Sequence, residues 1–272
     1  MSQPSIIDSL VEIFYLVRNY ILHPETKKGV IDVNPRGGLT REFDLVAEKM
    51  VIDYLMTHYP NSKILSEESG FINHHLNDFD YLFVIDPVDG SFNLVRGIPL
   101  VGFSIAVFKS DDISTKTVTH AIIGNIYSGL YLTAVAGEGA YMREQLITSY
   151  LDNPLEEKIV SCSLNRFEAD QFILFQALNQ TFKNIRSFSC SSIELSYVIQ
   201  GITSAHYDFR KRLTAENFLA AALILEEMGG KLSDLNGNAI SGISDLIKGY
   251  SIIACHRADD LHQYLDVLQR EV

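Results

Sequence analysis

The sequence contains little cysteine, which narrows the kinds of protein it can encode. Only three cysteines occur in 272 residues, at the distant positions Cys162, Cys190 and Cys255. An odd number of widely spaced cysteines argues against a disulfide framework and against a cysteine-based metal site. This usage favours a reducing compartment, so we expect a cytoplasmic protein.

Basic residues are scarce relative to acidic ones. Lys and Arg number 22 against 34 Asp and Glu, giving a formal net charge of −12. A nucleic-acid-binding surface needs clustered Lys and Arg, so no nucleic-acid partner is expected. If an acidic protein of this kind binds a phosphate ester, it needs a local source of positive charge, and metal ions can provide it.

Long uninterrupted apolar runs are also missing. Asp8, Glu12 and Arg18 interrupt the apolar pattern of the first predicted helix, so we expect no membrane-spanning segment. The same region lacks the basic flank and apolar centre of a signal peptide. Hydrophobic residues nevertheless make up 47% of the chain, which is enough for a full core in one large domain or two fused halves.

Hydrophobic periodicity predicts helices followed by strands in the first part of the chain. The predicted helices span residues 4–22 and 41–58, and the predicted strands span residues 63–65, 81–85, 101–108, 121–127 and 131–136. The last three strands are joined by turns rich in Ser, Asp and Gly, which indicates an antiparallel sheet. On the second helix, Asp44 and Glu48 lie four residues apart, on a different face from the apolar stripe.

A polar segment around Asn153-Pro154 suggests a boundary, giving an N-terminal half of residues 1–155 and a C-terminal half of residues 156–272. In the second half, predicted strands span residues 159–163, 185–189, 204–207 and 250–255, and predicted helices span residues 166–178, 192–200, 215–228 and 259–271. Such alternation is typical of α/β folds.

Two carboxylates follow the buried strand at residues 81–85. Pro87 and Gly90 break the strand and leave Asp86 and Asp89 at its carboxyl end, where α/β proteins usually place ligands. Glu67-Glu68 follow another apolar run. Clustered carboxylates repel one another unless a cation lies between them, and Mg²⁺ is the hard cation that prefers such ligands. The alternative is an ordinary Pro/Gly loop with Asp as a turn former.

Further segments extend this pattern: Gly97-Ile98-Pro99, residues 103–107 and Gly137-Glu138-Gly139-Ala140. Together with the acidic segments they resemble the inositol monophosphatase superfamily of Mg²⁺-dependent phosphatases, and within it the archaeal type that accepts inositol monophosphate and fructose 1,6-bisphosphate. The resemblance implies an α/β (α+β) fold, a layered αβαβα sandwich with an antiparallel sheet in the N-terminal half and an α/β C-terminal half. It also implies Mg²⁺ as cofactor, with Mn²⁺ as an alternative, a small phosphorylated polyol or sugar as substrate, and a homodimer.

The resemblance also assigns roles to individual residues. The implied metal ligands are Glu67, Asp86, the Val88 carbonyl, Asp89 and Asn217. The implied catalytic pair, which orients and deprotonates a water, is Asp44 and Ser91. The implied substrate contacts are Gly90, Ser91, Cys190, Ser191 and Arg210. Plainer interpretations remain for three segments: Glu68 as a solvated neighbour, the serines near Cys190 as helix caps, and Arg210 as a surface ion-pair residue.

The sequence departs from the family pattern at two positions. The family signature WDxAA precedes a helix ending in EAGG, and counting back from Gly229-Gly230 places Asn217 at the Asp position and Glu216 at the Trp position. Gly38 stands where many relatives carry an Asp. Glu216 is a poor substitute ligand if it lies in a helix, because adjacent helical residues point about 100° apart.

Two functions therefore remain open. One is a working phosphatase in which the phosphate of the substrate completes the second metal site. The other is a phosphatase-like binding or regulatory protein with a degenerate second metal site, at Asn217 and Gly38, and little turnover. Retention of Glu67, Asp86, Asp89, Ser91 and Asp44 favours the enzyme.

Overall fold

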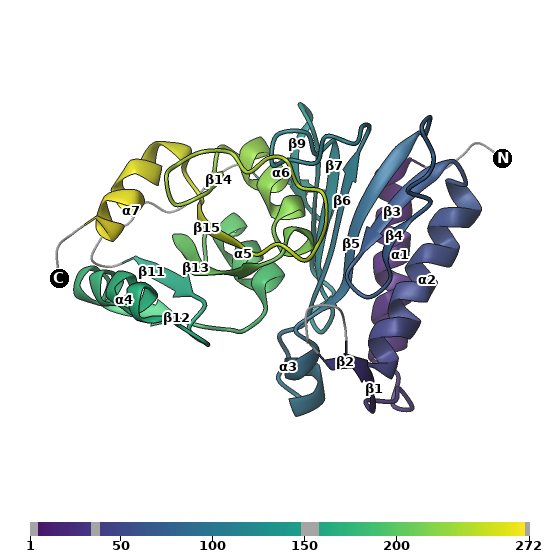
Figure 1. Cartoon of the computed structure of the whole chain (residues 1–272), viewed down its shortest axis with the longest axis horizontal. Helices are drawn as coiled ribbons and strands as arrows, with labels where there is room; N and C mark the ends of the chain where they lie inside the picture. The colour runs from purple at the N-terminus through teal and green to yellow at the C-terminus, as the bar shows by residue number, and fades with distance from the viewer. Residues whose placement is uncertain (1–4, 34–38, 148–157, 270–272) are drawn as a thin grey trace.

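The computed structural model of the chain describes residues 5–33, 39–147 and 158–269. These residues form layers in the order helix, sheet, helix, sheet, helix (Figure 1). The expected αβαβα sandwich is therefore confirmed. Both Gly38 and the boundary expected at Asn153-Pro154 lie outside the described residues.

The first sheet has eight strands in the order β10-β9-β8-β7-β6-β5-β3-β4. Its strands are β3 (Ser62–Ser66), β4 (Gly70–Ile72), β5 (Tyr81–Asp89), β6 (Gly102–Phe108), β7 (His120–Asn125), β8 (Tyr131–Val135), β9 (Gly139–Met142) and β10 (Gln145–Leu146). All neighbouring strands are antiparallel except β3 and β5, which are parallel. The antiparallel sheet predicted from residues 101–136 is thus the larger part of a mixed sheet.

Helices α1 (Ile6–Ile21) and α2 (Glu42–His58) cover one face of this sheet (Figure 1). Ser5 begins α1 by accepting a hydrogen bond from the Asp8 backbone N–H at 3.1 Å. The apolar stripe of α1 packs on the sheet, where a methyl group at Gly124 would lie 2.2 Å from the Phe14 ring. A short antiparallel pair, β1 (Val30–Val33) and β2 (Leu39–Arg41), leads into α2.

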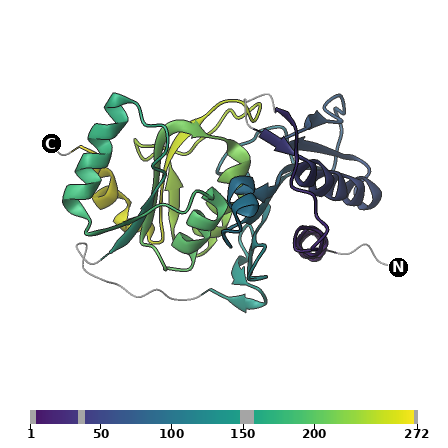
Figure 2. The ribbon, with the colours of Figure 1, turned by 90° about the horizontal axis from the view of Figure 1, so that it is seen from below.

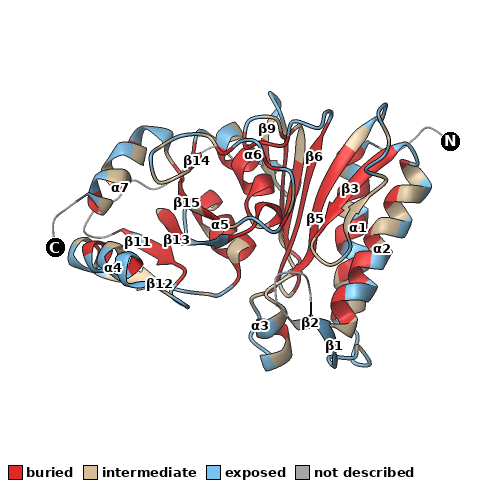
Figure 3. Ribbon diagram, viewed as in Figure 1, coloured by how far each residue is buried: buried red, intermediate tan, exposed pale blue. Residues whose placement is uncertain are grey.

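The middle layer consists of α5 (Ser191–Ile199) and α6 (Leu219–Glu227), which lie between the two sheets. Every residue from Leu219 to Leu225 is buried, as expected for a helix with a sheet on either side (Figure 3). The helix predicted at residues 215–228 is in fact two elements, because a 3₁₀ turn, η2 (Ala215–Asn217), precedes α6.

The second sheet has five strands in the order β12-β11-β13-β15-β14. These strands are β11 (Ile159–Cys162), β12 (Asn184–Arg186), β13 (Ala205–Leu213), β14 (Lys231–Ser233) and β15 (Tyr250–Cys255). β11 is parallel to β12 and β13, whereas β15 is antiparallel to β13 and β14. Helices α4 (Ala169–Thr181) and α7 (Leu261–Leu268), with the turn η3 (Ala258–Asp260) before α7, form the outer layer at the end of the molecule opposite α1 and α2 (Figure 2).

Candidate active site

The turn that carries Asp86 and Asp89 is a bulge inside strand β5. The register of β5 against β6 shifts between these two residues, so the prediction that the strand ends at Ile85 is wrong. Asp86 Oδ1 accepts a hydrogen bond from the Val88 N–H at 3.1 Å, which helps fix the bulge. Gly90 then turns the chain with φ of 90°, a conformation that favours glycine, and α3 (Ser91–Arg96) begins.

Asp86 is the centre of a group of carboxylates. Its side chain is buried, with only 2% of the residue exposed. Burial raises its pKa well above the ordinary value, and the negative charges of Glu67, Asp89 and Glu216 raise it further. The sequence predicted the contributions of Glu67 and Asp89 to this group, while that of Glu216 emerges only from the fold.

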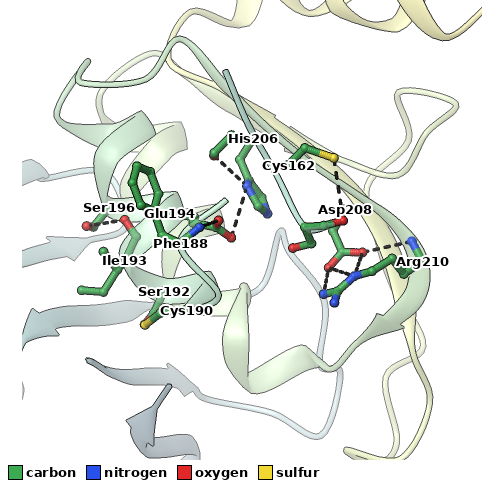
Figure 4. A network of polar contacts seen from close by, with 12 residues as sticks. Cys162, Phe188, Cys190, Ser192, Ile193, Glu194, Ser196, His206, Asp208 and Arg210 are labelled. Carbon is green, nitrogen blue, oxygen red and sulfur yellow. Dashed lines mark hydrogen bonds and ion pairs between the residues drawn. The ribbon is translucent and has the colours of Figure 1, made fainter. Parts of the chain in front are cut away.

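Asp89 links the β5 bulge to the start of α5. Its Oδ2 accepts hydrogen bonds from the Ser192 N–H at 2.6 Å and the Ser192 hydroxyl at 2.7 Å, with the Cys190 thiol at 3.4 Å. Cys190 and Ser192 lie together at the beginning of α5 (Figure 4). The pKa of Asp89 is raised because burial outweighs these hydrogen bonds. Of the predicted substrate contacts, Cys190 and Ser191 therefore lie beside a predicted metal ligand.

Ser91, at the start of α3, forms a hydrogen bond with Asp44 of α2. The Ser91 hydroxyl donates to Asp44 Oδ1 at 2.7 Å and lies 3.2 Å from the Val88 carbonyl oxygen. The Arg41 backbone N–H donates to Asp44 Oδ2 at 3.0 Å. Burial raises the pKa of Asp44 to about 7, although the hydrogen bond from Ser91 lowers it. A carboxylate of this pKa is suited to accept a proton near neutral pH.

Glu48 is a residue of the site that the sequence interpretation missed. We predicted that Asp44 and Glu48 lie away from the buried face of α2, but both are buried. The Glu48 carboxylate accepts hydrogen bonds from the hydroxyls of Ser66 and Ser69 and from the Glu68 backbone N–H. It thereby holds the turn between β3 and β4 that presents Glu67, and its spacing of four residues from Asp44 was the signal for this role.

Glu68 is better described as part of this turn than as a solvated neighbour. Its residue is half-buried, and its Oε2 accepts a hydrogen bond from the Thr40 hydroxyl at 2.6 Å.

The Arg210 side chain pairs with other side chains of the protein. Its guanidinium forms an ion pair with Asp208, with Nε to Oδ1 at 3.0 Å (Figure 4). It also donates a hydrogen bond to Asn165. Only 13% of the Arg210 side chain is exposed. The interpretation as a surface ion-pair residue is therefore right about the ion pair and wrong about the surface.

Asn217 lies in η2, beside Glu216. Its amide Nδ2 donates to Glu216 Oε1 at 2.9 Å and lies 3.4 Å from the Thr214 hydroxyl. The amide nitrogen therefore donates hydrogen bonds to protein groups. The amide oxygen is the only atom of this side chain that can bind a cation.

The chemistry of the donor set fits a divalent metal ion. In residues 5–33, 39–147 and 158–269, no three Asp, Glu, His or Cys side chains converge into a ready-made metal cage. However, the carboxylates that surround the buried Asp86 are close enough to raise its pKa and are of the ligand type that Mg²⁺ and Mn²⁺ prefer.

A second buried network supports the loop that precedes α5. Glu194 Oε1 accepts a hydrogen bond from the Phe188 N–H at 2.7 Å, and its Oε2 lies 3.7 Å from His206 Nδ1 (Figure 4). His206 Nδ1 is also 2.8 Å from the Ser161 hydroxyl. Burial raises the pKa of Glu194 to about 8 and lowers that of His206 to about 4, so both side chains are neutral between those values.

These shifts predict how stability depends on pH. Glu194 keeps a proton in the folded state that the unfolded chain loses near pH 4.5, so its contribution is complete below that pH and is lost as the pH rises toward 8. His206 opposes this change between about pH 4 and 6.5, where only the unfolded chain holds its proton. From pH 6.5 to 8 the contribution of Glu194 to the free energy of unfolding should fall by about 1.4 kcal/mol per pH unit.

The experiment is to measure the free energy of unfolding in urea at each pH for the wild type and for Glu194→Gln. The wild type should lose stability over this pH range relative to the variant. Parallel curves would contradict it.

Comparison with known proteins gives the class of this chain. A model of the inositol monophosphatase family matches residues 17–270. A "Fructose-1,6-bisphosphatase/inositol-1-monophosphatase" of Methanothermobacter thermautotrophicus is 30% identical, over 86% of this chain and 84% of the relative. The "Nus factor SuhB" of Pseudomonas aeruginosa is 30% identical, over 77% of this chain and 78% of the relative.

The solved structures agree with this result. The crystal structure of an inositol monophosphatase-fructose 1,6 bisphosphatase superposes with a TM-score of 0.80, at 26% identity, over 97% of this chain and 100% of that chain. Fold and relatives together define a phosphatase, a hydrolase of phosphoric monoesters. The chain belongs to the inositol monophosphatase family. Among the described residues, no helix is long and apolar enough to cross a membrane.

Proposed function

We propose that the protein hydrolyses a phosphate monoester of a small polyol or sugar, inositol monophosphate and/or fructose 1,6-bisphosphate, in a reaction that depends on Mg²⁺ or Mn²⁺. The observation that carries this proposal is the juxtaposition at the β5 bulge. A group of carboxylates around the buried Asp86 lies on the same bulge that leads to Ser91, which is hydrogen-bonded to Asp44. The names of the archaeal relatives support the substrate class.

The metal site would be formed by Glu67, Asp86, Asp89 and the Val88 carbonyl. Bound divalent ions would lower the pKa of the attacking water and place positive charge beside the phosphoryl oxygens. The carboxylates alone would repel the phosphate, since the protein carries a net charge of −12. This arrangement accounts for how an acidic protein can accept an anionic ester.

Ser91 and Asp44 would orient and deprotonate the water. The Ser91 hydroxyl donates its proton to Asp44 Oδ1, which leaves its oxygen lone pairs available to accept a hydrogen bond from the water. The proton of the water can then pass through Ser91 to Asp44, whose pKa of about 7 suits an acceptor near neutral pH. The proposed substrate contacts are Gly90, Cys190, Ser191 and Arg210; Gly90 precedes Ser91, and a Cβ added to it would lie 3.3 Å from Cys190 Sγ.

A second function has two observations in its favour. Asn217 brings no charge to the position where the family signature carries Asp, and a relative that covers most of this chain is named as a Nus factor. Under this alternative, the protein is a phosphatase-like binding or regulatory protein with little turnover.

The two functions can be separated by measuring phosphate release in Mg²⁺, Mn²⁺ or EDTA. The substrates are inositol 1-phosphate, fructose 1,6-bisphosphate and nucleotide monophosphates. We expect metal-dependent release from one of the first two substrates. Ser91→Ala should lower kcat by about 10²–10⁴-fold, because it breaks the path to Asp44. The exposed Ser244→Ala should change little. Folded wild-type protein that releases phosphate from none of these esters would favour the binding role.

A further inference from the structure

The backbone of Phe188, three residues before α5, is held by side chains from two different helices. The Glu194 carboxylate of α5 accepts a hydrogen bond from the Phe188 N–H at 2.7 Å (Figure 4). The Asn93 amide of α3 donates to the Phe188 carbonyl oxygen at 2.9 Å. Both of these side chains are buried, since Asn93 is 3% exposed and Glu194 is 0% exposed. The loop before α5 is therefore fixed at both polar groups of a single residue.

The Asn93 amide joins α3 to two other segments of the chain. Its Nδ2 donates to the Leu100 carbonyl oxygen at 2.9 Å as well as to that of Phe188. An amide nitrogen carries two N–H donors, so these two carbonyls use both of them. A carboxylate at this position would have no donor and would face two carbonyl oxygens. The position therefore requires an amide.

The next residue, Ser189, turns the chain toward the candidate metal site. Its φ is 55°, which lies in the left-handed region. A residue other than glycine keeps such a conformation only where the surrounding structure fixes it, and here the bonds to Phe188 fix the backbone on one side. Three residues further on, the N–H and the hydroxyl of Ser192 reach Asp89 Oδ2, at 2.6 and 2.7 Å.

The start of α3 lies against the start of α5, so the same contacts extend to the predicted catalytic pair. A Cβ added to Gly90 would lie 3.3 Å from Cys190 Sγ, which leaves little space between the two helix starts. Ser91 follows Gly90, and its hydroxyl donates to Asp44. Movement of the loop before α5 would therefore loosen the packing beside Ser91.

We propose that Asn93 and Glu194 are positioning residues of the candidate active site, which hold the Phe188 backbone and thereby keep the start of α5 against Asp89 and against the start of α3. The expected effect on turnover rests on the proposed phosphatase function, whereas the expected effect on the structure does not. Neither side chain has to touch the substrate. Removal of either bond should lower turnover, because a displacement of about 1 Å can lower a catalytic rate about a hundredfold.

Amide hydrogen exchange and phosphate release, measured on the same variants, test this proposal. Asn93→Asp replaces both donors with acceptors. It should speed exchange in residues 187–195 about tenfold, because a buried hydrogen bond is lost, and lower kcat about tenfold to a hundredfold. Exchange in α4 should stay unchanged, which separates a local effect from general destabilisation. Asn179→Asp, the same change at an exposed position of α4, is the matched control and should behave as the wild type does.

A second pair of variants separates the hydrogen bond of Glu194 from the bulk of its side chain. Glu194→Gln keeps an oxygen that can accept from the Phe188 N–H, whereas Glu194→Leu removes it. At pH 7, Glu194→Leu should lower kcat at least about tenfold, and Glu194→Gln should retain most of the turnover. The double variant Asn93→Asp with Glu194→Leu should lose little more than the more impaired single variant, because both side chains act on one segment.

Three results would overturn the inference. The first is unchanged exchange at residues 187–195 and unchanged kcat in Asn93→Asp or, if that variant does not fold, in Asn93→Ala. The second is an equal kcat for Glu194→Gln and Glu194→Leu. The third is a double variant whose loss is the product of the two single losses, since the two side chains would then act separately. If the wild type releases no phosphate, the proposed function fails, and the exchange measurements alone decide whether Asn93 and Glu194 hold the start of α5.

Discussion

Asp86→Asn should lower metal-dependent phosphate release by about a thousandfold or more and leave the Tm of the metal-free protein unchanged or higher. Asparagine keeps the shape of the side chain and can still accept the hydrogen bond from the Val88 N–H. It removes a buried charge that faces Glu67, Asp89 and Glu216, so the folded state loses repulsion. The same charge is needed to hold a divalent cation, and activity therefore falls while stability does not.

Steady-state kinetics and thermal unfolding in EDTA check the two parts of this prediction separately. Asp53→Asn, on the exposed side of α2, is the matched control and should leave activity intact, because the Asp53 side chain forms an exposed ion pair with Lys49. A variant at Asp86 that loses both activity and Tm would point to a structural role. One that retains full activity would remove Asp86 from the proposed metal site.

Phe14→Ala should reduce the free energy of unfolding by about 3–5 kcal/mol. The Phe14 ring is completely buried between α1 and the first sheet, 5.5 Å from the Phe103 ring centroid and against the bare backbone of Gly124. Truncation leaves a cavity that the neighbouring Phe103 and Tyr131 rings cannot fill, because both are held in the sheet.

Urea unfolding measures this effect as a lower midpoint with an unchanged slope. Leu16→Ala provides a comparison on the same helix, since Leu16 is 40% exposed, and it should cost about 1 kcal/mol or less. Equal losses for the two variants would show that α1 is stabilised by its helical propensity and not by its contact with the sheet.

The sequence was sufficient to predict the layered fold and the strand that carries Asp86 and Asp89. The strand follows from local patterns, namely apolar runs separated by turn residues and carboxylates next to proline and glycine. The layered fold was implied by the resemblance to the inositol monophosphatase superfamily. The boundaries were less accurate where the backbone changes type within an element. A bulge extends β5 to Asp89, and a 3₁₀ turn separates Glu216 from α6.

The role of Glu48 could not be predicted, because its partners are distant in sequence. Glu48 was placed on a face of α2 other than the apolar stripe, but the turn between β3 and β4 covers it with hydroxyl donors. Arg210 pairs with Asp208 within β13, but its contact with Asn165 depends on how β13 lies against the loop after β11. Such contacts follow from the packing of whole layers, which local patterns do not specify.

The bond between Asp89 and Ser192 joins residues 103 positions apart in the chain. During synthesis at about 5–20 residues per second, roughly 5–20 s pass between the emergence of Asp89 from the ribosome and that of Ser192. Throughout this interval the first sheet has no α5 to supply N–H and hydroxyl groups to the Asp89 carboxylate. The candidate site can therefore be completed only after α5 has emerged, late in the synthesis of the chain.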